Sequence, residues 1–201
     1  MKNLVVLVII ITVLSSCKEQ KRYIPNLTKF QKELNSSFKD VTKSPLTEED
    51  RLNFKSLDFF EFDSSYVVEA ILKPYVKDSI FGMKTNTERT HIYSKFGKIK
   101  FYLKNKYFEL NVFKDQELNN DNTKIDELFL PFYDKTNGIS TYSGGRYLDL
   151  IPSKDSVIII DFNKAYNPYC VYNYKFSCPL VPRENFIDTD IIAGVKDYVK
   201  N

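Results

Sequence analysis

Histidine is almost absent from this chain. Among its 201 residues the only histidine is His91, and no nucleophile motif surrounds it. A Ser-His-Asp or Cys-His site needs a histidine base, and a histidine-rich metal site needs several of these residues. The composition therefore excludes a histidine-rich metal centre and gives little support to triad catalysis. We expect no metal and no other cofactor.

An excess of charge of one sign is also absent. The chain has 29 Lys and Arg against 26 Asp and Glu, and its net charge is +3. No large basic face is required by this composition, which argues against nucleic acid as a partner. Tryptophan is missing and there are only six glycines, whereas the chain has 14 Tyr and 16 Phe. Aromatic and β-branched residues favour strands.

Long apolar runs are confined to the N-terminus. Lys2 precedes an unbroken apolar run over Leu4–Ile11, and the small residues Ser15 and Ser16 follow it. These are the parts of a secretory signal. The run is shorter than the roughly 20 residues that a bilayer-spanning helix needs. We therefore predict a signal peptide over residues 1–16.

The end of this signal carries a cysteine. Leu14-Ser15-Ser16-Cys17 resembles the lipobox of bacterial lipoproteins. The resemblance implies a diacylglyceryl group on the Cys17 thiol, cleavage just before it, and firm anchoring in a lipid bilayer by several acyl chains such as palmitate. An uncleaved anchor or a soluble secreted protein is the alternative. Lys18 is not the aspartate of inner-membrane retention, which favours the outer membrane, and Cys17-Lys18-Glu19 resembles a surface-display signal of some Bacteroidetes.

The mature part has the length of one domain. Residues 17–25 are charged, end at Pro25, and indicate a short tether before a single globular domain over residues 26–201. Asn26 can cap a helix whose apolar face is spaced by three or four residues. That face consists of Leu27, Phe30, Leu34, Phe38 and Val41. Pro45 ends this helix, and Thr47-Glu48-Glu49-Asp50 predicts the start of a second, short one.

Strand patterns follow the two helices. Tyr66–Lys73 predicts a strand that ends at Pro74, and Ile99–Leu103 with Tyr107–Phe113 predicts a hairpin around Lys104-Asn105-Lys106. Strands do not alternate with long helices, so a parallel sheet is not expected. The predicted fold class is α+β, a mainly antiparallel sheet of barrel or sandwich type with N-terminal helices packed on it.

A second hairpin is predicted from Tyr147–Ile151 and Val157–Phe162, joined by a loop at Pro152 to Asp155. In that register Arg146 lies beside Asp161 on one face. A charge at the end of a buried face is costly unless it is paired. We therefore expect an ion pair between Arg146 and Asp161.

The C-terminal third contains a series of short sequence motifs. They are Phe129-Leu130-Pro131-Phe132, Asp134, Thr136-Asn137-Gly138, Thr141-Tyr142, Gly144-Gly145-Arg146-Tyr147, Asp149, Asp161-Phe162-Asn163, Ala165-Tyr166-Asn167-Pro168, Cys170, Cys178-Pro179-Leu180, Pro182, Glu184-Asn185 and Ala193-Gly194. Together these motifs resemble a bacterial and archaeal family, that of domain of unknown function 1684, and the similarity extends from about Phe30 onward. Val181 and Val195 depart from it, standing where we expect Pro and Glu, and Val195 removes a carboxylate. The resemblance implies a length and no reaction.

Two cysteines remain in the mature chain, Cys170 and Cys178. Outside the cytoplasm such pairs usually form disulfides, and this short loop can turn back on itself. Closing it contributes on the order of 2–3 kcal/mol. A redox pair favours the Cys-x-x-Cys spacing instead, and a two-thiolate metal site lacks its other ligands. We predict a structural disulfide.

Polar residues cluster after Gly144-Gly145. Loop residues of this kind often form binding sites, carboxylates can act as acid and base in glycoside cleavage, and arginine–carboxylate networks can be purely structural. Tyr142, Tyr147, Tyr166 and Tyr169 can stack on a sugar or pack. The leading interpretation is an envelope lipoprotein that binds a small ligand, carbohydrate or partner protein; the alternative is a hydrolase that uses Asp149, Asp161 or Glu184. The cluster consists of Arg146, Asp149, Asp161, Asn163, Asn167, Glu184 and Asn185.

Overall fold

The computed structural model describes residues 27–117, 127–153 and 155–199. The predicted signal peptide, the tether with Cys17, and the predicted cap Asn26 lie outside these residues. Within the described part of the chain, no helix is long and apolar enough to cross a membrane.

Both predicted helices are present. Helix α1 spans Lys29–Lys39 and α2 spans Glu48–Asn53. The predicted cap Asn26 is wrong, because α1 begins at Lys29 and Thr28 caps it in a capping box with Gln31. The Thr47 hydroxyl caps α2 by accepting from the Asp50 amide. The predicted apolar face extended too far, because α1 ends at Lys39 and Val41 is 72% exposed.

The helices pack mainly on loops rather than directly on the sheet. Phe38 of α1 lies in an apolar cluster with Phe59, Tyr172 and Val195, which come from distant parts of the chain. The Asn35 carboxamide accepts the Leu57 amide at 2.8 Å. The helical layer thus joins the N-terminal segment to the C-terminal third.

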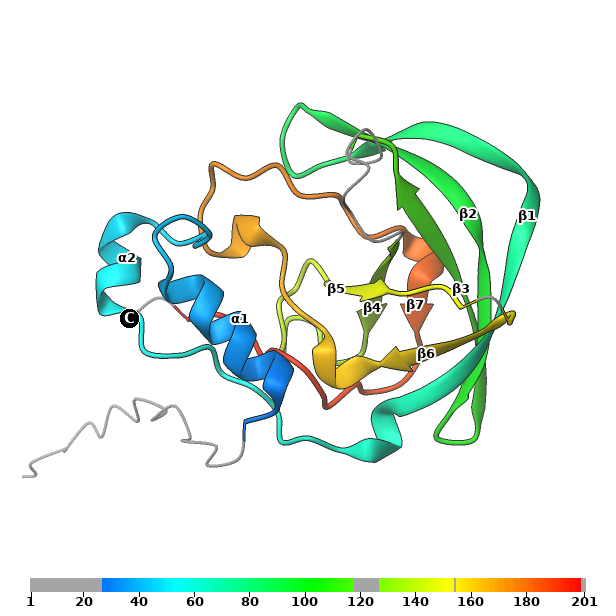
Figure 1. Cartoon of the computed structure of the whole chain (residues 1–201), viewed down its shortest axis with the longest axis horizontal. Coiled ribbons are helices and arrows are strands. Elements are labelled where there is room, and N and C mark those ends of the chain that lie inside the picture. Colours follow the sequence, from blue (N-terminus) through cyan, green and yellow to red (C-terminus); the bar gives the residue numbers. More distant parts are fainter. Residues whose placement is uncertain (1–26, 118–126, 154, 200–201) are drawn as a thin grey trace, which may run out of the picture.

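A curled antiparallel sheet, a half-barrel, forms the rest of the domain (Figure 1). Its strand order is β5-β4-β3-β2-β1-β6, and short β7 pairs with β4 in parallel. The predicted fold class is confirmed. The strands are β1 Val67–Lys84, β2 Thr90–Leu103, β3 Lys106–Asp115, β4 Leu128–Asp134, β5 Arg146–Leu150, β6 Val157–Asp161 and β7 Phe186–Ile187. Single 3-10 turns are η1 Ser64–Tyr66, η3 Phe162–Lys164, η4 Tyr169–Val171 and η5 Arg183–Asn185.

The hairpin of β2 and β3 is confirmed. Its turn consists of Lys104 and Asn105 with φ of 49° and 62°, as a two-residue hairpin turn of matching twist requires. The predicted end of the first strand at Pro74 is wrong, because β1 continues to Lys84 after a register shift between Pro74 and Ser79. Proline has no amide to donate, and the ladder is interrupted there rather than ended.

The second predicted hairpin is wrong. Strand β5 pairs with β4, and β6 pairs with β1, so the two strands are opposite edges of the sheet. Curling brings these edges near one another without pairing them (Figure 1). Both strands are largely apolar on both faces, which suits several neighbours equally, so the pattern does not determine the pairing partner.

The main core fills the concave side of the sheet. Leu148 and Leu150 of β5 point into it, together with buried residues of the other long strands. Successive side chains of a strand point to opposite faces. Tyr147 and Asp149 therefore point to the other face, where a smaller aromatic cluster includes Tyr93 and Phe113. The two faces of β5 thus carry one charged residue each, Arg146 on the core face and Asp149 on the other.

Candidate functional site

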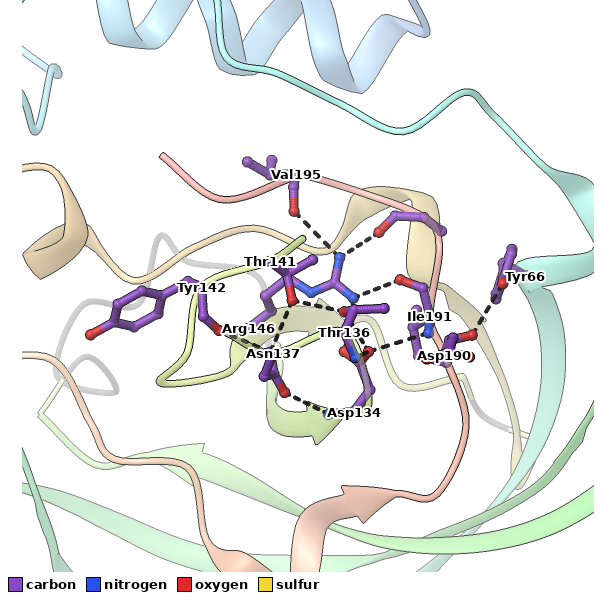
Figure 2. Close-up of polar contacts among 11 residues, drawn as sticks. Tyr66, Asp134, Thr136, Asn137, Thr141, Tyr142, Arg146, Asp190, Ile191 and Val195 are labelled. Carbon is purple, nitrogen blue, oxygen red and sulfur yellow. Dashed lines mark hydrogen bonds and ion pairs between the residues drawn. The ribbon is translucent and has the colours of Figure 1, made fainter. Parts of the chain in front are cut away.

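Arg146 is the centre of a closed polar network on the core face (Figure 2). Its guanidinium pairs with the Asp134 carboxylate at 2.9 Å, and both side chains are fully buried. It also donates to the carbonyl oxygens of Ile191, Ala193 and Val195. The expected pair with Asp161 is wrong, because that expectation rested on the β5–β6 hairpin.

The second oxygen of Asp134 is also fully used. Asp134 Oδ1 accepts from the backbone and hydroxyl of Thr136 and from the Ile191 amide. The Thr136 hydroxyl continues the network to Thr141 at 2.8 Å (Figure 2). Gly145 lets the backbone before Arg146 lie close to β4. Its φ is +89°, and a Cβ there would lie 2.8 Å from the Phe132 carbonyl oxygen.

This network has the properties of a structural element. Burial lowers the pKa of Arg146, and the charge and hydrogen bond of Asp134 oppose that shift. Nearly every polar atom has a protein partner, so a ligand would find few groups to bind. The network instead joins the C-terminal segment over residues 191–195 to Asp134 at the end of β4 and to Arg146 at the start of β5.

The side-chain carboxamides of Asn185 and Asn163 form hydrogen bonds with backbone groups, as a peptide unit would. The Asn185 carboxamide accepts from the Asn111 amide and donates to the carbonyls of Asn111 and Pro131, at 2.7–2.9 Å. It thus bridges β3 and β4 where Pro131 has no amide. Asn163 exchanges two hydrogen bonds of 3.0 Å with the backbone of Asp63.

The remaining members of the predicted cluster are dispersed. Asp161 caps η3 by accepting from Asn163, and its nearest cation is Lys164 at 3.9 Å. Buried Asn167 donates to the Lys196 carbonyl at 2.8 Å. Glu184 lies on the surface, 3.6 Å from Lys95. The structure therefore does not bring Asp149, Asp161 and Glu184 together.

Asp149 lines a cavity of about 700 Å³ on the opposite face of β5. The ends of β2, β3 and β4, helix α1 and the segment after η3 supply the other walls. The lining residues are Phe30, Leu34, His91, Tyr93, Asp115, Glu127, Phe129, Tyr147, Asp149, Tyr166, Pro168, Tyr169, Phe176, Ser177, Cys178 and Pro179.

Aromatic rings in mutual contact form much of this lining. Tyr93 stacks on Phe129 with ring centroids 5.3 Å apart, and Phe129 meets Tyr147 edge-on at 4.7 Å. Tyr147 in turn meets Tyr166 edge-on at 5.9 Å. Such edge-to-face contacts hold each ring in a defined orientation. The cavity is thus built on a fixed aromatic wall.

Asp149 is the polar centre of this wall. The Tyr166 hydroxyl donates to its Oδ2 at 2.8 Å. Its side chain is exposed to the cavity yet surrounded by protein, and this partial desolvation raises the pKa of Asp149 to about 6. The hydrogen bond from Tyr166 opposes the shift, and the charge of Glu127 adds to it. Carboxylates shifted in this way are typical of functional clefts.

His91 lies at another wall of the same cavity. Its Nε2 is 2.7 Å from the Asp115 carboxylate, its Nδ1 is 3.5 Å from Glu117, and its ring contacts Tyr93. These partners hold the imidazole. Within residues 27–117, 127–153 and 155–199, no group of three His, Cys, Asp or Glu side chains is arranged to hold a metal ion.

Cys178 also lines the cavity, and Cys170 lies next to it. The Cys170 amide donates to the Cys178 sulfur at 3.1 Å. The two sulfurs are unbonded in the structure. The thiols interact: the Cys170 thiol donates to Cys178, which lowers the pKa of Cys178 and raises that of Cys170. The disulfide stays a prediction that this proximity permits.

The sequence interpretation placed Asp149, Tyr147, Tyr166 and Tyr169 among its candidates, and all four line the cavity, whereas Tyr142 of the same set is not among the lining residues. It gave no role to Asp134, the carboxylate partner of Arg146, although Asp134 ends an apolar strand. It also missed the cavity residues of β2 and β4, because contacts between distant strands leave no local pattern.

The domain is thus a curled half-barrel with a cavity on the outer face of β5. The chain matches the model of a protein family of unknown function, DUF1684, over residues 52–196. It belongs to this family. A solution NMR structure of an uncharacterized protein from Haloarcula marismortui is similar, with 34% identity, a TM-score of 0.65, and coverage of 83% of this chain and 89% of that one. No curated protein matches the chain.

Proposed function

We propose that this protein is a lipoprotein of the cell envelope, held to a bilayer by acylated Cys17, whose domain binds a small ligand without catalysis. The cavity carries the proposal. It is of the size that ligand pockets usually have, is lined mainly by aromatic rings, and has a few polar groups directed into it. The lipobox supports the anchor. Outer-membrane residence and a Bacteroidetes type of lipoprotein are part of the proposal.

The dispersal of the predicted carboxylates favours binding over hydrolysis. A glycosidase needs two carboxyl groups facing one another across a cleft, about 5–9.5 Å apart. Of the residues proposed for hydrolysis, only Asp149 lines the cavity; Asp161 caps η3, and Glu184 faces Lys95. Two other carboxylates line the cavity: Asp115 is engaged with His91, and the charge of Glu127 raises the pKa of Asp149.

One observation favours the hydrolase alternative, namely the pKa of Asp149 near 6. A general acid in a hydrolase has a pKa raised in this way. Ligand bound in the cavity would then be recovered as cleaved product. Recovery of an intact molecule after incubation with the purified protein supports binding alone.

Native mass spectrometry of protein extracted from its own membranes tests the binding proposal. We expect a bound small molecule in the natural protein and its loss in Ser177→Trp, because the indole fills the cavity that Ser177 lines. Ser36→Trp, on an exposed position of α1, is the matched control and keeps the ligand. A ligand retained equally by both variants would place binding elsewhere.

Labelling with a radioactive fatty acid tests the anchor. We expect Cys17→Ser to abolish the label and to leave the protein unprocessed or released from the membrane. Cys170→Ser is the control, because this cysteine lies far along the chain from the lipobox. Unchanged labelling of Cys17→Ser would contradict the anchor.

A further inference from the structure

We infer that the cavity takes an organic cation, a small amine or quaternary ammonium compound whose charge lies against Asp149 and whose apolar part lies on the aromatic wall. This inference rests on the proposed binding function and deepens it. It follows from the charges of the lining residues, from their aromatic rings, and from the Asp149 oxygen that accepts no hydrogen bond within the described residues.

Among the described residues, those that line the cavity include acidic groups and no lysine or arginine. Asp115, Glu127 and Asp149 contribute carboxylates, and the one basic group, His91, is held by Asp115 at 2.7 Å. Several acidic groups facing one partly enclosed space produce a negative potential there. An anionic ligand would meet this potential without a compensating cation.

The aromatic rings of the cavity also attract a cation. The face of an aromatic ring is negative, and a cation within about 6 Å of its centre is stabilised, more so when water is excluded. Tyr93, Phe129, Tyr147 and Tyr166 line the space and fix one another by ring contacts. Quaternary ammonium groups are recognised in cages built from such rings.

Asp149 has one oxygen left for a ligand. Within the described residues its hydrogen-bonding partner is Tyr166, which occupies Oδ2. In the described part of the chain, no hydrogen bond is made to Oδ1. A bound ammonium group would supply the counter-charge that this partly desolvated carboxylate lacks.

Neutral donors suited to a sugar are few. The Tyr147 hydroxyl already donates to the Pro179 carbonyl, and the Tyr166 hydroxyl donates to Asp149. The Ser177 hydroxyl is shared with Thr87 at 2.8 Å. Among the described residues, the hydroxyls of Tyr93 and Tyr169 make no hydrogen bond, so a carbohydrate would replace only part of its hydrogen bonds to water.

Three probes of the same shape and different charge test the inference. They are choline, 3,3-dimethylbutanol and 3,3-dimethylbutanoate, each titrated into the isotope-labelled mature protein while amide shifts of cavity residues are followed by NMR. We expect choline to bind at least tenfold more tightly than the neutral alcohol, a difference of about 1.4 kcal/mol. The anion should bind more weakly still.

Asp149→Asn should remove most of this charge preference and leave the affinity for the neutral alcohol nearly unchanged. Tyr166→Phe keeps the ring and should retain a preference for choline. Glu69→Gln, an exposed carboxylate outside the cavity lining, is the matched control and should leave all three affinities unchanged.

Equal or tighter binding of the neutral or anionic probe in the cavity would overturn the cation inference and leave the proposed binding function standing. Failure of choline to perturb any cavity resonance would also overturn the inference. The proposed function fails separately, in the native mass measurement, if no molecule accompanies the protein or if Ser177→Trp retains it.

Discussion

Arg146 and Asp149 are three residues apart on one strand, and they differ in almost every physical respect. Arg146 points to the core, is fully buried, and has a carboxylate and three carbonyls as partners. Asp149 points to the cavity, is exposed to it, and has a single hydrogen-bonding partner in the described structure. The strand thus separates a closed polar network from an open one.

The difference indicates what each network does. A closed network leaves little for a ligand to bind, and its removal leaves buried groups without partners, so its contribution is to stability. An open network keeps a partly desolvated carboxylate that lowers stability, which is expected where binding requires it. Variants of the two residues should therefore change different properties of the protein.

The largest effect is expected for Arg146→Ala. It leaves the Asp134 carboxylate and three carbonyls without a cation, and breaking such a buried pair costs about 3–5 kcal/mol of unfolding free energy. Urea denaturation measures it. Lys164→Ala, an exposed cation 3.9 Å from Asp161, is the control and should change stability by less than about 0.5 kcal/mol. A loss below about 1 kcal/mol for Arg146→Ala would contradict a structural role.

An intermediate effect is expected at the cavity wall, where Cys170 and Cys178 lie together. We expect the purified mature protein to gain two hydrogens in mass on reduction, and Cys170→Ser to lower stability by about 2–3 kcal/mol. Free thiols that react with an alkylating agent in fresh protein would contradict the disulfide. In that case the difference between the two faces of β5 would be larger, because no disulfide would stabilise the loop between Cys170 and Cys178 at the cavity.

The smallest effect on the free energy of unfolding is expected for Asp149→Asn, and this substitution should raise stability rather than lower it. The carboxyl titrates near 6 in the folded protein and near the ordinary value of 3.8 when unfolded, so the folded form binds more protons between these values. The charge of Asp149 therefore lowers stability as pH rises from about 4 to about 6. Because the group is exposed to the cavity, we expect Asp149→Asn to raise stability by less than about 1 kcal/mol at pH 7.

At pH 4 this gain should disappear, because the carboxyl of Asp149 is then neutral in the folded protein. Thermal unfolding at both pH values measures the difference between Asp149→Asn and the natural protein. A loss of stability at pH 7 would show that the carboxylate is structural. Among the described residues, the titratable groups that share the cavity with Asp149 are His91, Tyr93, Asp115, Glu127, Tyr147, Tyr166, Tyr169 and Cys178.

Local features of the fold could be predicted from the sequence. Thr47 and the spacing around Phe38 predicted the helices, and the alternation around Lys104-Asn105 predicted the first hairpin, because capping and turn chemistry act over a few residues. The pairing of β5 and β6 could not be predicted. Their apolar character suited an adjacent hairpin as well as two edges that curl toward each other.

The candidate site was predicted only in part, for the same reason. Asp149 and its tyrosines lie close together in sequence and could be proposed as a group. Asp134 and the β2 residues at the cavity depend on which strands become neighbours, and no local pattern determines that. The predicted ion pair between Arg146 and Asp161 was wrong because it assumed that β5 and β6 pair with one another.

The titration of the Asp149 side-chain carboxyl, followed by carbon NMR in the natural protein with and without choline, tests the central claim most directly. The account predicts a pKa of about 6 in the free protein, because the cavity partly desolvates the group. A bound cation stabilises the carboxylate, so choline should lower this pKa. A pKa near 4 that choline leaves unchanged would contradict both the partly enclosed carboxylate and its role in binding.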